Sequence, residues 1–314
     1  MKKRFNRGRS LKAFLVNGVT LGLLSLALSC CQTLKIPGNG PLSLSMPARP
    51  LGSTGYRVSL LSLGGSTLGR HGQETACEII NRALDMGVNY IDTAPRYCKG
   101  CNFLSETYIG RVMKDRRNDV FLATKSHDFG YSGTMELVKK SLKCLQTDRI
   151  DLYQHHGVSN DRQLRQVLSE NGALKAFLEL KEKKVVRFIG ITSHSPRILL
   201  KALELDVYDC MLISLNPAGR AMMDREYLDA FMNRAREKGV GVIVMNIADG
   251  GRLLRQGTTM QELFNYSLSY PVASALVGAS MLWHVEENVQ SVKNFRKLSD
   301  FEKSELEERF KQRK

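Results

Sequence analysis

Four residues of the chain have side chains that together could transfer a proton to a carbonyl oxygen: Asp92, Tyr97, Lys125 and His156. Tyrosine, with a free pKa of about 10, is a weak acid at neutral pH. A buried ammonium beside it stabilises the phenolate and lowers that pKa. Asp92 would keep Lys125 charged and oriented, and His156 would hydrogen-bond the substrate oxygen. Such a proton donor performs half of a carbonyl reduction, and the other half requires a hydride from a nicotinamide cofactor.

Eight short apolar or β-branched runs recur along the chain and predict the strands that position these residues. They cover residues 58–66, 88–94, 120–125, 150–156, 187–193, 210–216, 241–246 and 274–280. Segments with helical periodicity lie between them. In residues 74–87 the apolar side chains share one stripe and Gly87 ends the helix, and residues 224–239 have the same design.

The predicted strand ends are spaced by roughly 25 to 35 residues, which fits one βα unit each. Eight such units in about 260 residues predict a (β/α)8 TIM barrel. The alternative is a doubly wound open sheet, which would carry a G-x-G-x-x-G turn after an early strand. SLGGSTLG at residues 62–69 is only weakly similar to that turn. In a barrel, the four residues named above lie at or just after strand ends and are expected to meet at one face.

The N-terminal residues predict export rather than part of the fold. A basic stretch through Lys12 precedes the apolar run Ala13–Ser29, which is the pattern of a secretory signal. Ser29 before Cys30 resembles the cleavage site of bacterial lipoproteins, so residues 1–30 are interpreted as a signal peptide with Cys30 as a candidate lipidation site. Residues 31–50 are rich in proline and predict a linker, and the folded domain is expected over 51–314. The predicted location is the bacterial cell envelope, with membrane contact only through the signal or lipid.

The composition does not favour a nucleic-acid-binding protein. The formal net charge is +15, but the first twelve residues contain six basic residues and no acid. No later basic block is interleaved with aromatic residues, and the chain has a single Trp. A basic, solvated surface explains the remaining charge.

Several stretches resemble the aldo/keto reductase superfamily over nearly the whole of the predicted domain. LGSTGYRVS resembles the opening hairpin of the family, GVNYIDTAPRY and the following SETYIGRVMKDRRNDVFLATK resemble its most recognisable stretch, and TDRIDLYQHHG resembles its histidine strand. The resemblance assigns the catalytic Asp, Tyr, Lys and His to Asp92, Tyr97, Lys125 and His156. His155 is expected to point to the other side of its strand.

The resemblance also implies NADP or NAD, bound across the barrel mouth, and a small carbonyl substrate. Gly65 and Ser66 would lie under the nicotinamide ribose. The remaining implied contacts are Thr192, Ser193 and Asn216 near the nicotinamide, Gly250, Gly251 and Leu253 at the pyrophosphate, and Gly278, Ser280, Glu287 and Asn288 at the adenosine. No metal site is expected.

Two features depart from the family pattern. His284 stands where many relatives carry an arginine for the 2′-phosphate, so NADP is only slightly favoured over NAD. Cys98 and Cys101 form a C-x-x-C pair after Tyr97, where relatives usually have glycine. The pair is interpreted as structural, as a disulfide of an oxidising compartment, or as part of a metal site.

Three hypotheses follow for the function. The first is an NAD(P)-dependent carbonyl reductase with Tyr97 as proton donor. The second is a non-enzymatic nicotinamide-binding redox sensor that responds through Cys98 and Cys101. The third is a sugar-modifying enzyme that retains its cofactor, which export would favour.

Overall fold

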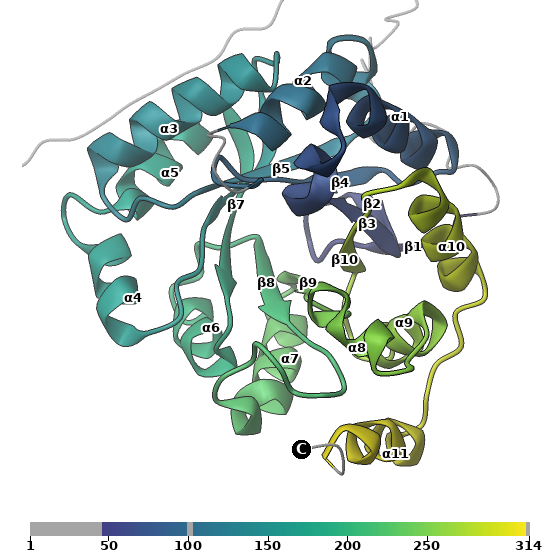
Figure 1. The fold of residues 1–314 in the computed structure, drawn as a ribbon. Coiled ribbons are helices and arrows are strands. Elements are labelled where there is room, and N and C mark those ends of the chain that lie inside the picture. The colour runs from purple at the N-terminus through teal and green to yellow at the C-terminus, as the bar shows by residue number, and fades with distance from the viewer. Residues whose placement is uncertain (1–45, 99–102, 312–314) are drawn as a thin grey trace, which may run out of the picture. The chain divides into compact units, whose positions relative to one another are not determined.

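A computed structural model describes residues 46–98 and 103–311. Eight parallel strands form a closed barrel in the order β10-β3-β4-β5-β6-β7-β8-β9, and helices surround it (Figure 1). The strands are β3 (Leu61–Gly64), β4 (Tyr90–Asp92), β5 (Phe121–Ser126), β6 (Ile150–His155), β7 (Val186–Ser193), β8 (Cys210–Ser214), β9 (Gly241–Met245) and β10 (Ser274–Gly278). The predicted (β/α)8 barrel is confirmed.

The helices follow the strands in the expected alternation. The α-helices are α1 (Gly72–Asp85), α2 (Leu104–Arg116), α3 (Tyr131–Cys144), α4 (Asp161–Leu168), α5 (Ala173–Glu182), α6 (Pro196–Leu203), α7 (Leu228–Glu237), α8 (Arg252–Arg255), α9 (Met260–Leu268), α10 (Leu282–Lys293) and α11 (Asp300–Lys311). Short 3-10 helices are η1 (Gly65–Arg70), η2 (Arg117–Asp119), η3 (Arg225–Tyr227) and η4 (Asp249–Gly251). The predicted stripe of α1 is buried, and Gly87 has a φ of 91°, which glycine adopts without strain.

The first predicted strand, residues 58–66, is divided in the structure. β2 (Arg57–Ser59) pairs antiparallel with β1 (Ala48–Pro50), and only then does β3 enter the barrel. At the division, the Leu60 amide donates to the carbonyl of Pro47 over 2.8 Å. Residues 46–50 therefore belong to the folded region and not to the predicted linker. Pro50 is compatible with this strand because it ends a short edge strand, where a missing N–H is tolerated.

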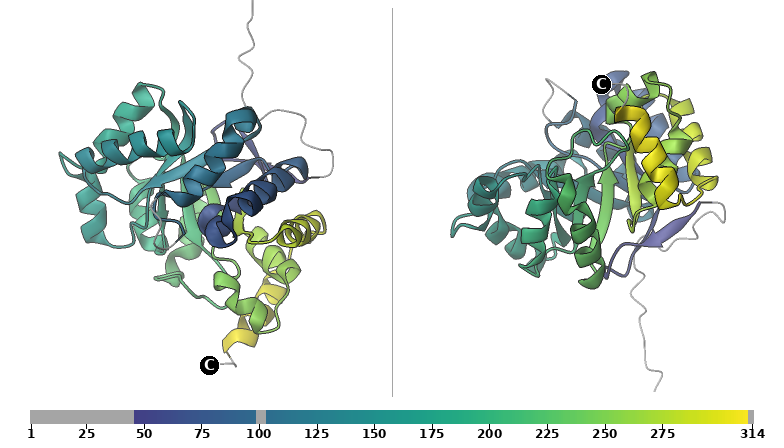
Figure 2. Two further views of the ribbon diagram at one scale, coloured as in Figure 1. Left: turned by 45° about the horizontal axis from the view of Figure 1, so that its top comes forward. Right: turned by 90° about the horizontal axis from the view of Figure 1, so that it is seen from below.

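The β1–β2 hairpin lies at the end of the barrel where the strands begin (Figure 2). Its Tyr56 packs edge-on against Phe121, the first residue of β5, with ring centroids 5.0 Å apart. Val58 of the hairpin and Leu152 of β6 are buried in the same apolar cluster. This packing closes the amino end, so the strand carboxyl ends form the accessible face.

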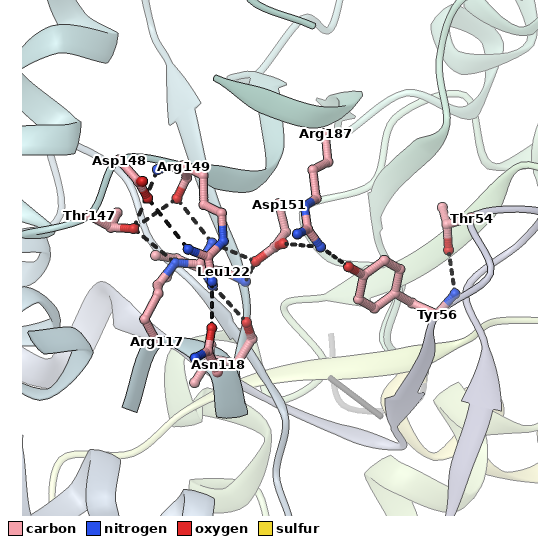
Figure 3. Close-up of polar contacts among 11 residues, drawn as sticks. Thr54, Tyr56, Arg117, Asn118, Leu122, Thr147, Asp148, Arg149, Asp151 and Arg187 are labelled. Atoms are coloured by element: carbon pink, nitrogen blue, oxygen red, sulfur yellow. Dashed lines mark hydrogen bonds and ion pairs between the residues drawn. The ribbon is translucent and has the colours of Figure 1, made fainter. Parts of the chain in front are cut away.

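A buried carboxylate also organises the closed end. Asp151 of β6 accepts from Arg117 over 2.8 Å and from the Leu122 amide over 2.8 Å. Its other oxygen lies 3.5 Å from Arg187, which also contacts the Tyr56 hydroxyl. Figure 3 shows Arg187 between Asp151 and Tyr56. Two guanidinium groups and one backbone amide thus stabilise the charge of Asp151, as a buried ion requires.

No helix within the described residues has the length and apolar composition needed to cross a membrane. The predicted signal peptide and Cys30 lie outside the described residues, as does Cys101.

Candidate active site

Asp92 is the last residue of β4 and is fully buried. Its Oδ1 pairs with the ammonium of Lys125, and its Oδ2 accepts from Gln154 Nε2 over 2.8 Å. Strand pairing produces this geometry, because β4, β5 and β6 are consecutive neighbours and all three side chains point into the barrel. Burial raises the pKa of Asp92, whereas the charge of Lys125 and the hydrogen bonds of Lys125 and Gln154 act against that rise.

Lys125 lies at the centre of the site and is 1% exposed. Its Nζ donates to Asp92, to the backbone carbonyl of Thr93 over 2.9 Å and to the Tyr97 hydroxyl over 3.1 Å. An ammonium has three N–H donors, and these three acceptors use them all. Burial lowers the pKa of Lys125, but the charges of Asp92 and Tyr97 and their hydrogen bonds outweigh it and raise the pKa overall. The lysine is therefore a fixed cation.

Tyr97 lies on the loop after β4. Its amide donates to the Ala94 carbonyl over 3.1 Å, which closes a turn and directs the ring over the strand ends. Lys125 Nζ lies 4.8 Å from the ring centroid as well as beside the hydroxyl. Burial raises the pKa of Tyr97, and the charge of Lys125 acts in the opposite direction without reversing the shift.

The expectation that Lys125 lowers the pKa of Tyr97 below its ordinary value is therefore wrong for the net shift. The contribution of Lys125 has the expected sign, but the cost of burying a phenolate is larger. Tyr97 thus stays protonated throughout the neutral range.

His156 completes the group. Its ring lies 5.8 Å from that of Tyr97, nearly perpendicular to it. Burial, followed by the charge of Lys125, lowers the pKa of His156 to about 3, so the imidazole is neutral. The neighbouring His155 faces outward and stacks on Phe177 of α5 at 3.9 Å. This geometry agrees with the prediction that His155 points to the other side of its strand and that His156 faces the site.

A carboxyl that the sequence analysis did not single out lies behind Lys125. Glu106 of α2 is buried and accepts from Thr124 Oγ1 over 2.5 Å. Burial raises the pKa of Glu106 to about 7. The residue faces the outer side of β5, so it supports the strand that carries Lys125 rather than the mouth.

Beside Tyr97, an elongated cavity of about 460 Å³ runs over the ends of β9, β10 and β3. Figure 1 places α8 and α10 beside these strand ends. Seven predicted cofactor residues line the cavity: Ser66, Gly250, Gly251, Gly278, Ser280, Glu287 and Asn288. The cavity thus joins the residues predicted to contact the pyrophosphate, those predicted to contact the adenosine, and Tyr97 in one site.

The other predicted cofactor residues do not line this cavity: Gly65, Thr192, Ser193, Asn216 and Leu253. The carbonyl of Gly65 accepts from Ser105, and Thr192 accepts from the Gly157 amide. The side-chain amide of Asn216 bonds to Arg220 in its own loop and to the Asn246 carbonyl after β9, and Leu253 is part of the apolar core. Ser193 is buried and bonds to the backbone of Ser195.

Three further residues that line the cavity were missed: Arg70 of η1, Arg255 of α8 and Trp283 of α10. Arg70 and Arg255 are both exposed, and neither forms an ion pair within residues 46–98 and 103–311. Trp283 is 57% exposed and packs against His284 at 3.9 Å. Only tertiary structure could bring η1 and α10 together, although Arg70 follows a predicted strand end.

The cavity fits a dinucleotide. Gly250 and Gly251 have φ values of 62° and 84°, and a Cβ on Gly250 would meet no atom within 4 Å. Two cations without carboxylate partners among the described residues flank this backbone, which suits a diphosphate. Trp283 offers an aromatic face to a base.

Cys98 lies next to the cavity. Its Sγ accepts from the Gly69 amide over 3.1 Å, and its φ of 69° is unusual for a residue with a side chain. The disulfide, metal and structural interpretations of the C-x-x-C pair stay predictions, because Cys101 lies outside the described residues.

A closed parallel barrel with buried ionisable groups at its strand carboxyl ends is the arrangement of (β/α)8 enzymes. Residues 60–267 match the Aldo/keto reductase family, and the chain belongs to that family. Its members are oxidoreductases that generally bind NAD(P)H and act on small carbonyl compounds.

Individual relatives match over most of their length. The uncharacterised oxidoreductase YqkF of Bacillus subtilis is 27% identical over 309 residues, which cover 85% of this chain and 97% of the relative. L-galactose dehydrogenase of Arabidopsis thaliana is 28% identical over 291 residues, or 80% and 89% of the two chains. The holo form of aldo-keto reductase AKR11C1 from Bacillus halodurans has a TM-score of 0.69 at 27% identity and covers 84% and 96% of the chains.

Proposed function

We propose that the protein is an NADPH-dependent reductase of aldehydes, ketones or sugars, with Tyr97 as the proton donor. One observation carries the proposal: Lys125 Nζ contacts both Asp92 and the Tyr97 hydroxyl, the latter over 3.1 Å. A phenol beside a fixed ammonium can release its proton, because the ammonium stabilises the phenolate that remains.

Each residue of the group has one role in this mechanism. Tyr97 gives its proton to the carbonyl oxygen, Lys125 stabilises the phenolate, and Asp92 holds Lys125 in place. His156, neutral because burial lowers its pKa to about 3, donates an N–H to the same oxygen and orients the carbonyl. The bound nicotinamide would supply the hydride for the carbonyl carbon, so that the product is an alcohol.

The charges of the cavity support NADPH over NADH. Burial lowers the pKa of His284, so this histidine does not replace the charge of the arginine that many relatives have. Arg70 supplies a permanent cation next to it and is proposed to bind the 2′-phosphate. Arg255, whose Nη1 lies 3.5 Å from a Cβ built on Gly251, is proposed to bind the pyrophosphate. Glu287 would favour a free 2′-hydroxyl instead, so the balance between Glu287 and Arg70 sets the preference.

Nucleotide binding tests the proposal directly, because the only tryptophan of the chain, Trp283, lines the cavity. NADPH and NADH are titrated against the folded domain, and quenching of Trp283 fluorescence reports binding. Arg70→Gln is expected to weaken NADPH about 10-fold and to leave NADH within about 2-fold. Arg111→Gln, on the exposed surface of α2, is the matched control. Equal losses for both nucleotides would contradict the assignment of Arg70.

Turnover separates the proposal from its alternatives. Aldehyde-dependent oxidation of NADPH supports a reductase. Binding without turnover, together with a response to thiol oxidation, would support the redox sensor. Nucleotide that copurifies with the protein and does not exchange would support the enzyme with retained cofactor.

We also propose that the protein is exported and anchored by lipid on Cys30, on the strength of the basic and apolar N-terminal segments alone.

A further inference from the structure

The residues around Asp92, Tyr97, Lys125 and His156 follow the carboxyl ends of the barrel strands. Lys125 of β5 points into the barrel, while the next residue, Ser126, bonds outward to Thr134 of α3 over 3.0 Å. His127, the next residue, lies beyond β5 on the loop to α3, at the carboxyl end of the barrel. At the end of β6, His155 packs outward, and His156, the residue after the strand, faces Tyr97.

The neighbouring strand and loop add two more basic residues at this mouth. His194 follows β7, and its Nδ1 lies 2.8 Å from Ser214 Oγ at the end of β8. Arg96 directly precedes Tyr97 on the loop after β4. Arg96, His127 and His194 are here named the mouth cluster. The charges of all three contribute, after burial and Lys125, to the lowered pKa of His156, which agrees with their closeness.

Two residues of the mouth cluster, Arg96 and His127, have polar groups that could bind an anion. Arg96 is exposed and forms no ion pair within the part of the chain that the structure describes. Nδ1 of His127 is buried and has no hydrogen-bond partner among the described residues. A buried polar atom of this kind normally has a partner, so among the described residues this nitrogen is available to a water or a ligand.

The carboxylates of Asp92 and Asp128, which lie near the mouth cluster, already have other partners. Asp92 lies below the mouth and is paired with Lys125. Asp128, adjacent to His127, accepts from the Gly130 amide over 2.7 Å and lies against Gly133 of α3. It therefore points to the outer side and does not neutralise Arg96.

We propose that the substrate is a carbonyl compound that carries an anionic group, a carboxylate or a phosphate, which Arg96 and His127 bind while Tyr97 and His156 hold the carbonyl. This inference rests on the proposed reductase function. Arg96 supplies the charge and a planar set of donors, and His127 supplies one buried contact. The Nδ1 of His194 is already used by Ala221 and Ser214, so His194 is assigned no contact with the anion.

The test compares aldehydes that differ in charge but little in shape. The first pair is 4-carboxybenzaldehyde and its amide, 4-carbamoylbenzaldehyde. The second pair is glycolaldehyde phosphate and glycolaldehyde, which distinguishes a phosphate site from a carboxylate site. For at least one pair, the wild-type protein is expected to reduce the anion with a kcat/KM about 10-fold or more above that of the neutral compound. Because Arg96 is exposed, added salt should reduce this ratio.

Variants identify the residue that causes the preference for the anionic aldehyde. Arg96→Gln should lower kcat/KM for the anion about 10-fold and leave the neutral compound within about 2-fold. His127→Gln should also reduce the preference, and Arg111→Gln on α2 should retain it. Calorimetry of each compound against the protein loaded with NADP+ gives the same comparison without turnover, as preferential binding of the anion.

The two proposals fail in different ways. If the neutral compounds are reduced as well as the anions, or if Arg96→Gln affects both members of a pair equally, the anionic substrate is wrong and the reductase stands. If no nucleotide binds and no aldehyde is reduced, the proposed function itself is wrong.

Discussion

Replacement of Lys125 by methionine is the perturbation with the clearest structural consequence. Methionine keeps most of the length and apolar volume of the lysine but removes the ammonium. Asp92 then retains only the 2.8 Å hydrogen bond from Gln154 and has no counter-charge among the described residues. Tyr97 loses the group that stabilises its phenolate.

The expected loss of stability follows from the burial of the pair, in which the side chains are 1% and 0% exposed. Breaking a buried ion pair by removing one partner costs about 3–5 kcal/mol, because the other charge remains buried. The double variant Lys125→Met/Asp92→Asn removes both charges and should recover most of this loss. Both variants should lose reductase activity, since neither has the ammonium.

The assay is urea unfolding of the wild-type domain, the single variant and the double variant. Without Lys125, only the hydrogen bond from Gln154 opposes the effect of burial on Asp92, so the folded-state pKa stays above the unfolded value. A carboxyl whose pKa is raised in the folded state destabilises the protein at pH values above that pKa. This destabilisation decreases as the pH falls toward the raised pKa. The difference in free energy of unfolding between the single and double variants should therefore shrink from about pH 8 to about pH 5.

Two results would refute this reasoning. If Lys125→Met is as stable as the wild type, Asp92 does not depend on the lysine for its charge. If the double variant is no more stable than the single one, the loss comes from packing and not from an uncompensated carboxylate.

Three further predictions concern other parts of the chain. Asp151→Asn should lower the free energy of unfolding by about 3 kcal/mol, because it leaves Arg117 buried without a counter-charge; a change below about 1 kcal/mol in chemical denaturation would count against the network in Figure 3. Burial raises the pKa of Glu106 to about 7, above its unfolded value, so its ionisation destabilises the folded protein as the pH rises. The stability of Glu106→Gln relative to wild type should therefore increase between about pH 5 and pH 7 and level off above that. A stability difference that does not change with pH would exclude the shift in pKa. Cys30→Ala should abolish incorporation of labelled fatty acid into the full chain in bacterial cells, and undiminished labelling would exclude lipidation at that residue.

The barrel could be predicted from sequence because its signals are local and repeated. Each strand is a short apolar run, and each helix has a stripe such as that of α1. The division of residues 58–66 into β2 and β3 was not predictable from the run itself, since it depends on contact between Leu60 and Pro47. The inclusion of residues 46–50 in the fold has the same tertiary origin.

The grouping of Asp92, Tyr97, Lys125 and His156 was also predictable, because strand ends of a barrel converge and the local sequence resembles the family. The direction of the pKa shift of Tyr97 was not predictable, because it depends on how far the ring is buried. Arg70 and Trp283 come from η1 and α10, which are distant in sequence and lack a shared motif. Strand alternation placed His155 outward, whereas His127 and His194 follow the ends of β5 and β7 and their positions came only from the structure.

The central claim, that Tyr97 donates the proton, is tested most directly by Tyr97→Phe. NADPH affinity is measured by quenching of Trp283, and turnover by oxidation of NADPH with a reactive aldehyde. If Tyr97 is the proton donor, the variant should bind NADPH within about 2-fold of wild type and have a kcat lower by about 100-fold or more, since general acid catalysis contributes that much. Turnover of Tyr97→Phe at the wild-type rate, with equal NADPH binding, would exclude Tyr97 as the proton donor.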